Sequence, residues 1–149
     1  MNLQQEVRGL LDLAKHRWPV TADHVEHYFA PRAKAITHSN PNLDHPPWAD
    51  RVGDVRDTFV ELGGDVAGVR IPQIQTAGSD QYAELFVAKG TIADVEAVVG
   101  PVKRSLHMHP ESPEMFIAYP IVAGHHLRVL IEQAYETKKL VVMIHYENG

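Results

Sequence analysis

A chain of 149 residues with 44% apolar and 22% charged residues has the composition of one globular domain, which argues against wholesale disorder. Its formal charge of −5 and the lack of a Lys/Arg run disfavour binding to duplex nucleic acid, whose phosphates would be repelled. Without cysteine there are no disulfides, and without a membrane-length apolar run or a signal-like N-terminus we expect a cytoplasmic protein.

Two short helices are predicted at the N-terminus. In the first, apolar side chains recur at helical spacing: Val7, Leu10, Leu11, Ala14 and Trp18. Pro19 ends this helix, and Thr21 is a suitable N-cap for the second, which stops before Pro31. The second helix presents three apolar side chains on one face: Val25, Tyr28 and Phe29. Because the link between them is short, we expect the two helices to pack as a hairpin.

The next thirty residues are harder to assign. Residues 31–46 carry three prolines and little periodic apolar content, so we interpret them as a long surface loop. In residues 48–62 the apolar positions are four and three apart, and Gly63-Gly64 follows as a stop, which favours a helix. Residues 58–60 (Thr-Phe-Val) have strand propensity instead. We predict a helix here, which makes the part up to about residue 63 helical.

From Val66 the pattern becomes that of a sheet part, over about residues 66–149. Five strands are predicted, at residues 66–74, 82–88, 115–122, 127–132 and 140–146. Short polar turns between consecutive strands indicate antiparallel pairing, and Pro72 restricts its segment to a sheet edge or a strand end.

One short helix is inserted in this sheet part. It covers residues 91–99, with Thr91 as its cap, Asp94 in its first turn and Gly100-Pro101 after its last residue. The expected fold class is therefore α+β: N-terminal helices packed on a small, mostly antiparallel sheet of about five strands, in a single domain of residues 1–149.

The most suggestive chemistry is His107-Met108-His109, followed by Glu114. Residues two apart in a strand share a face, so both imidazoles could meet one metal ion with Glu114 as a third ligand. The pattern His-x-His-x4-Glu resembles the first motif of the cupins, which implies a metal-binding barrel enzyme or module. The spacing to the flanking glycines is too long, however, and no second motif follows. We therefore interpret these histidines as exposed and expect no metal or other cofactor.

Other chemical motifs are weak. His24 and His27 lie three apart on the second helix and share a face, but nothing nominates a third metal ligand, so a solvated helix face is preferred. No serine lies in the context of a nucleophile elbow, and no glycine cluster has the spacing of a phosphate-binding loop. The sequence therefore favours a role without catalysis.

A proline-rich approach to an aromatic residue, residues 42–48, is typical of an interface loop. The residues we expect to contact a protein partner lie there and beside the histidine motif: Asp44, His45, Trp48, Glu111 and Glu114.

Residues 89–101, Lys-Gly-Thr-Ile-Ala-Asp-Val-Glu-Ala-Val-Val-Gly-Pro, and the strands after them look like a recurring bacterial unit. In this unit a strand runs into a short helix that ends in Gly-Pro, and a small sheet follows. The segment 89–149 thus resembles small bacterial α+β toxin-immunity proteins. The resemblance implies a non-enzymatic cytoplasmic protein that neutralises a secreted toxin by protein–protein binding, but it assigns no functional residue.

The acidic charge of this chain would suit a basic toxin domain. Two alternatives stay open: the cupin-like metal-binding enzyme or module, and a domain that binds a small ligand between its helices and its sheet.

Overall fold

The computed structural model describes residues 2–16, 22–39, 57–72, 81–105, 114–122, 124–134 and 136–146. Its helices are α1 (Leu3–His16), α2 (Ala22–Phe29) and α3 (Ile92–Val99), with a 3-10 turn, η1 (Ala30–Arg32), after α2. Its strands are β1 (Ala35–Ser39), β2 (Asp57–Glu61), β3 (Val66–Pro72), β4 (Gln81–Val87), β5 (Lys103–Ser105), β6 (Glu114–Ala118), β7 (Ile121–Val122), β8 (His125–Gln133) and β9 (Leu140–Tyr146). None of the described helices is long and apolar enough to cross a membrane.

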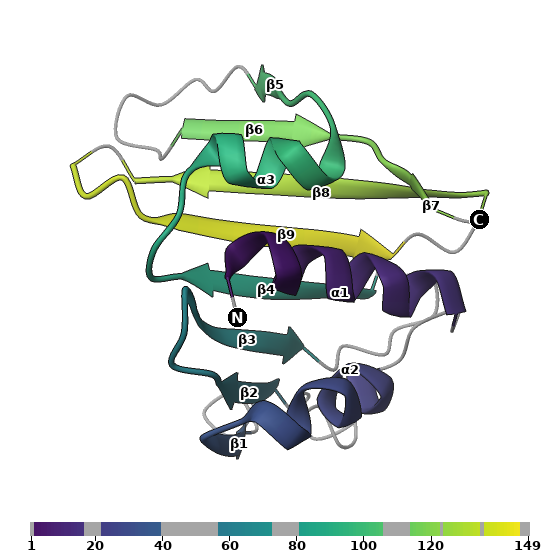
Figure 1. Ribbon diagram of the computed structural model, residues 1–149, viewed down its shortest axis with the longest axis vertical. Helices are drawn as coiled ribbons and strands as arrows, with labels where there is room; N and C mark the ends of the chain where they lie inside the picture. The colour runs from purple at the N-terminus through teal and green to yellow at the C-terminus, as the bar shows by residue number, and fades with distance from the viewer. Residues whose placement is uncertain are drawn as a thin grey trace, which may run out of the picture.

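These elements form two layers, with the three helices on one face of the sheet (Figure 1). The strand order is β1-β2-β3-β4-β9-β8-β6-β5, with β7 paired to β8, and every described pairing is antiparallel. The expected α+β class is thus confirmed, but the sheet has nine described strands where about five were predicted. The pairing of β4 with β9 joins two meanders at the centre of the sheet.

The first helix forms as its apolar spacing predicts. Its buried stripe packs into the core with residues of the sheet: Leu3, Val7, Leu10 and Leu11. The helix packs more extensively against α3 than against α2, which lies instead on β2 and β3. The expected hairpin of the first two helices is therefore only partly right, because each of them buries its apolar face mainly against other elements.

The inserted helix α3 has the predicted bounds. Its first turn is closed by Asp94, whose Oδ2 accepts hydrogen bonds from the backbone N–H of Thr91 at 2.8 Å and from its hydroxyl at 3.1 Å. At the other end Gly100 has a φ of 90°, a backbone conformation that favours glycine. Val95 and Val99 form the buried side of the helix.

The predicted helix over residues 48–62 is wrong where the chain is described, because residues 57–61 form β2. Thr58 and Val60 are buried while Phe59 and Glu61 are exposed, which is the alternation of a strand. Pairing with β1 on one side and β3 on the other outweighs the helical spacing of the apolar residues.

The predicted loop over residues 31–46 is wrong in part, because it contains η1 and β1. Side chains along β1 are exposed where they are described, so the strand shows no apolar alternation that could have revealed it. Residues 40–56 lie outside the described residues, and the rest of these two predictions stays untested. Pro72 is the last residue of β3, a strand with neighbours on both sides, so of its two expected positions the strand end is the correct one.

Candidate functional site

The register of the sheet assigns each described strand residue to one of two faces. Under the helices, a row of directly opposed, buried residues crosses five strands: Val60, Val69, Leu85, Val142 and Ile131. The neighbouring row points the other way, because successive residues alternate: Thr37, Phe59, Arg70, Glu84, Met143, Leu130, Ile117 and Lys103. A second row on this side contains Gly68, Phe86, Val141, Glu132 and Met115. We call these two rows the open face, since no described helix covers them (Figure 1).

The open face carries seven partly exposed apolar side chains: Phe59, Phe86, Val141, Met143, Leu130, Ile117 and Met115. Phe59 is 37% exposed, and its ring centroid lies 6.0 Å from that of Phe86. The ring of Phe59 lies over Gly68, where any Cβ would overlap it. Contiguous exposed apolar surface of this kind marks sites of protein–protein contact.

Paired charges lie among these apolar side chains. Arg70 and Glu84 form an ion pair across β3 and β4, with 3.3 Å between Nη1 and Oε2. Further along the face, Nη2 of Arg128 donates to Nδ1 of His145 at 3.5 Å. A guanidinium can only donate, so this geometry requires an imidazole with an unprotonated Nδ1. Arginine beside methionine and phenylalanine is the side-chain mixture enriched in protein interfaces.

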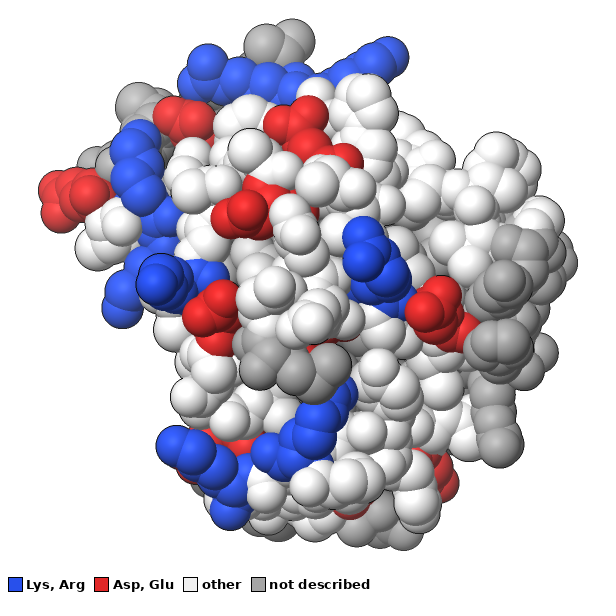
Figure 2. All heavy atoms as spheres, in the orientation of Figure 1, with Lys and Arg blue, Asp and Glu red and all other residues white. Residues whose placement is uncertain are grey.

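The opposite, helix-bearing face differs in character. Figure 2 shows it with basic and acidic side chains interspersed among uncharged surface. A broad field of one sign, which would attract a polyanion, is not visible over the described residues on this side. Charge on this face thus gives no reason to place a site there.

Most residues expected to bind a partner cannot be placed. Asp44, His45, Trp48 and Glu111 lie outside the described residues, and their assignment stays a prediction. Glu114 opens β6, and its Oε1 lies 3.9 Å from Nη2 of Arg104 on β5. It belongs to the helix-bearing side of the sheet, two residues from Phe116, and is therefore not part of the open face.

The cupin-like motif is likewise only partly described. His107 and His109 lie outside the described residues, and Glu114 is the one member of the motif whose surroundings are known. In the described ranges, no three His, Asp or Glu side chains are grouped so that they could hold a metal ion.

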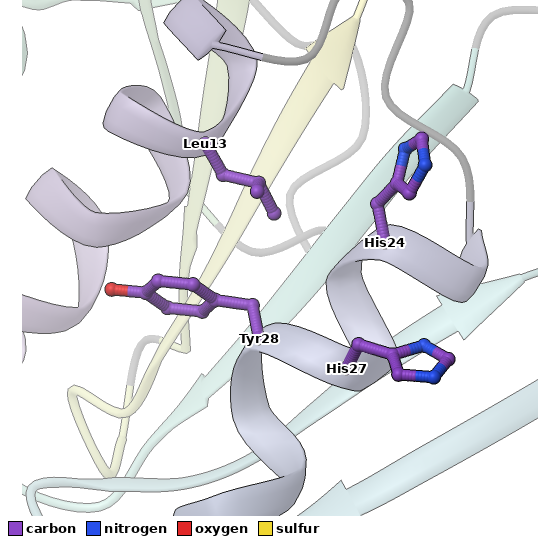
Figure 3. A pocket seen from close by; sticks show the side chains of 4 residues that line it. All are labelled: Leu13, His24, His27 and Tyr28. Atoms are coloured by element: carbon purple, nitrogen blue, oxygen red, sulfur yellow. The ribbon is translucent and has the colours of Figure 1, made fainter.

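A cavity of about 460 Å³ lies beside α1 and α2, and its described lining residues are Leu13, His24, His27 and Tyr28 (Figure 3). Leu13 and Tyr28 point across the gap between the two helices, whereas both histidines project from α2. Nδ1 of His27 lies 2.7 Å from the carbonyl oxygen of Asp23. A carbonyl only accepts, so Nδ1 of His27 carries a proton. The two histidines thus share a helix with a defined cavity, although they are not grouped as metal ligands.

An ion pair with a buried carboxylate joins α1 to η1, and the apolar spacing of the first helix gives no sign of it. Glu6 is 3% exposed and pairs with Arg32, whose guanidinium lies 5.2 and 5.0 Å from the ring centroids of Tyr28 and Phe29. The pair borders a cavity of about 260 Å³ that also touches Leu62, Gly64 and Val66. Cation–π contact and the carboxylate together hold Arg32 in place.

A threonine, a histidine and a glutamate also lie in series. Nδ1 of His38 is 2.9 Å from the hydroxyl of Thr58, and its Nε2 is 3.5 Å from Oε1 of Glu26. The order of groups is that of a nucleophile, a base and its orienting acid. Thr58 is only 4% exposed, however, so its hydroxyl is inaccessible to a substrate. The series ties α2 to β1 and β2, which is a structural role.

Comparisons of this chain with protein-family models, with curated proteins and with solved structures return no match. What the protein does is therefore argued from its own geometry.

Proposed function

We propose that this protein is an immunity protein, a cytoplasmic binding protein that neutralises a secreted bacterial toxin by covering its surface. The observation that carries the proposal is the open face. Seven apolar side chains there remain partly exposed, although a folded chain gains free energy by burying such groups, at about 25 cal/mol per Å². A protein partner would complete that burial.

The chemistry of the open face favours a protein over a small molecule. A sheet that crosses eight strands offers breadth rather than a concave pocket, and breadth suits an interface of about 800 Å² per partner. Phe59, Phe86 and Met143 are the residue types that contribute most to such interfaces. The charged residues in the two rows of the open face balance, Arg70 and Lys103 against Glu84 and Glu132, so it is the net charge of −5 of the whole chain that favours a basic partner and would speed its association.

The test uses the toxin domain that, on this proposal, is encoded beside the gene of this protein. Co-expression of the two is expected to restore growth of cells that the toxin alone arrests. Met143→Lys places a cation at the centre of the open face, directly opposite Glu84, which favours a folded variant. We expect this variant to lose protection and to bind the toxin at least about 30-fold more weakly, the effect of losing one interface hot spot.

The matched control is Ala93→Glu, an exposed position in the first turn of α3 on the helix-bearing face. It should protect as well as the unmodified protein, because it changes charge without touching the open face. The proposal fails if no toxin gene neighbours this one, or if a folded Met143→Lys variant protects fully.

A second candidate function is supported by the cavity beside α1 and α2. Its volume of about 460 Å³ is within the range of small-ligand sites, and its described lining combines apolar groups with two imidazoles. Imidazole N–H groups, which can donate to a carboxylate, and the ring of Tyr28 suit an aromatic carboxylate. Benzoate and its larger analogues should then raise the melting temperature, and Leu13→Trp, which fills the cavity, should abolish that rise. If the melting temperature is the same with and without these compounds, the ligand function is rejected.

A further inference from the structure

The two edges of the sheet differ in how they are protected against pairing with another strand. β5 has three residues, of which Lys103 and Arg104 are charged. Shortness and charge are the usual means by which proteins keep a sheet edge from associating. β1 has five residues, Ala-Ile-Thr-His-Ser, without lysine, arginine, acid or proline. Only β1 therefore lacks these protective features.

The outer side of β1 is available for pairing in the described part of the chain. Among the described strands, β1 pairs with β2 alone. Residues 35–38 are exposed, and Ile36 is 36% exposed, one of few large apolar side chains at that level. A strand in this position presents backbone N–H and C=O groups that only water or another strand can satisfy.

We infer that β1 pairs with β1 of a second copy of this chain, in antiparallel orientation, so that two sheets join into one. In an antiparallel strand pair, the side chains of directly facing residues lie on the same side of the sheet. The twofold axis that relates two copies of β1 must therefore pass through a residue and not between two residues, which leaves Ile36, Thr37 and His38 as its possible positions. Only the axis at Thr37 uses all five residues of both strands. It places Thr37 opposite its own copy and Ile36 opposite His38, and no two like charges face each other.

Charge complementarity favours a second copy as the occupant. The antiparallel arrangement brings the start of one β1 beside the end of the other. Lys34 flanks the start, whereas the end carries His38, which contacts Glu26 of α2. The Lys34 side chain lies along Gly63 of its own chain, and in the strand pair it is nearer to Glu26 of the other copy than to the other copy's Lys34. Because one strand pair is small against the roughly 1,200–2,000 Å² of stable interfaces, the dimer should depend on concentration.

The first measurement is sedimentation equilibrium over a wide range of protein concentrations. We expect the mass to rise from that of one chain to that of two as the concentration increases. Thr37→Lys, at an exposed position, sets two like charges opposite each other on the axis and should keep the protein monomeric with an unchanged circular dichroism spectrum. A chain that is monomeric at every concentration overturns the inference, and so does a dimer that Thr37→Lys leaves intact.

The second measurement uses the absence of cysteine from the sequence. Facing residues in an antiparallel pair have Cα atoms about 4.5–5.5 Å apart, within the range that a disulfide spans. Thr37→Cys should therefore form a disulfide-linked dimer under mild oxidation, whereas Arg104→Cys on the other edge should not. If the two variants cross-link equally, β1 does not pair with β1 of a second copy in preference to the other edge of the sheet. Both measurements are made without toxin, so their outcome does not depend on toxin binding at the open face, to which Thr37 itself belongs.

Discussion

The ring of Tyr28 on α2 packs directly onto Gly9 of α1, at a point where a Cβ on Gly9 would overlap the phenol oxygen. Glycine inside a helix costs about 1 kcal/mol relative to alanine, and here it allows close approach of the two helices. The same tyrosine makes an edge-to-face contact with Phe29 and lies under the guanidinium of Arg32. Tyr28 therefore has little freedom to move away from α1.

Gly9→Ala is consequently expected to lower stability, although alanine is the better helix former. The loss should shrink when Tyr28→Phe removes the oxygen that the new methyl group meets. A double-mutant cycle measured by urea unfolding should give a coupling of about 1 kcal/mol or more between the two positions. Additive effects would mean that the contact between Gly9 and Tyr28 is not tight.

The buried ion pair predicts an asymmetric response to mutation. Arg32→Met leaves the carboxylate of Glu6 buried without its partner and should cost about 3 kcal/mol of unfolding free energy. Combining it with Glu6→Gln should recover part of that loss, because the buried charge is gone. Arg8→Met, at an exposed position of α1, is the control and should change the free energy of unfolding by less than about 0.5 kcal/mol. A double variant less stable than Arg32→Met would contradict this account.

Lys138 is the one described non-glycine residue with positive φ, at 58°. It lies in the turn before β9, and a side chain in this conformation is strained. Lys138→Gly should therefore raise the unfolding free energy by about 1 kcal/mol. The substitution Lys139→Gly at the neighbouring position also removes a positive charge, but it relieves no backbone strain. It should therefore leave the free energy of unfolding unchanged or lower it. Thermal unfolding of the two variants separates backbone strain from charge.

The assignment of the two sheet faces can be tested with adjacent residues. Val142 is fully buried under the helices, and Met143 belongs to the open face. Val142→Lys buries an unpaired charge and should unfold the protein. Met143→Lys should leave it folded, because its side chain reaches solvent beside Glu84. Circular dichroism should show a folded Met143→Lys variant and an unfolded Val142→Lys variant. If Met143→Lys also unfolds the protein, the open face is covered.

The fold could be predicted wherever the local sequence pattern, such as a helix cap or an apolar run, matches the element that forms in the folded chain. The helix 91–99 has its cap, its first-turn acid and its glycine stop within a dozen residues. β9 could be read from its apolar run. By contrast, residues 35–38 of β1 are all exposed and β2 carries helical spacing, so both strands depend on neighbours that a local pattern does not contain.

The candidate site was less predictable than the fold. The open face exists because β4 pairs with β9, which brings Glu84 beside Met143 although they are almost sixty residues apart. No periodic pattern in the sequence predicts that Glu84 and Met143 lie side by side. The burial of Glu6 could not be predicted for a similar reason, since its partner Arg32 belongs to a different element. Longer-range pairing, rather than composition or periodicity, creates both features.

The most direct test of binding through the open face uses the methionine methyl groups as probes. The chain has four methionines, and two of them, Met115 and Met143, lie on the open face. We expect their carbon-13 methyl signals to shift when the toxin domain encoded beside the gene is added. If the toxin binds, as judged by calorimetry, while both signals stay unchanged, the open face is not the binding surface.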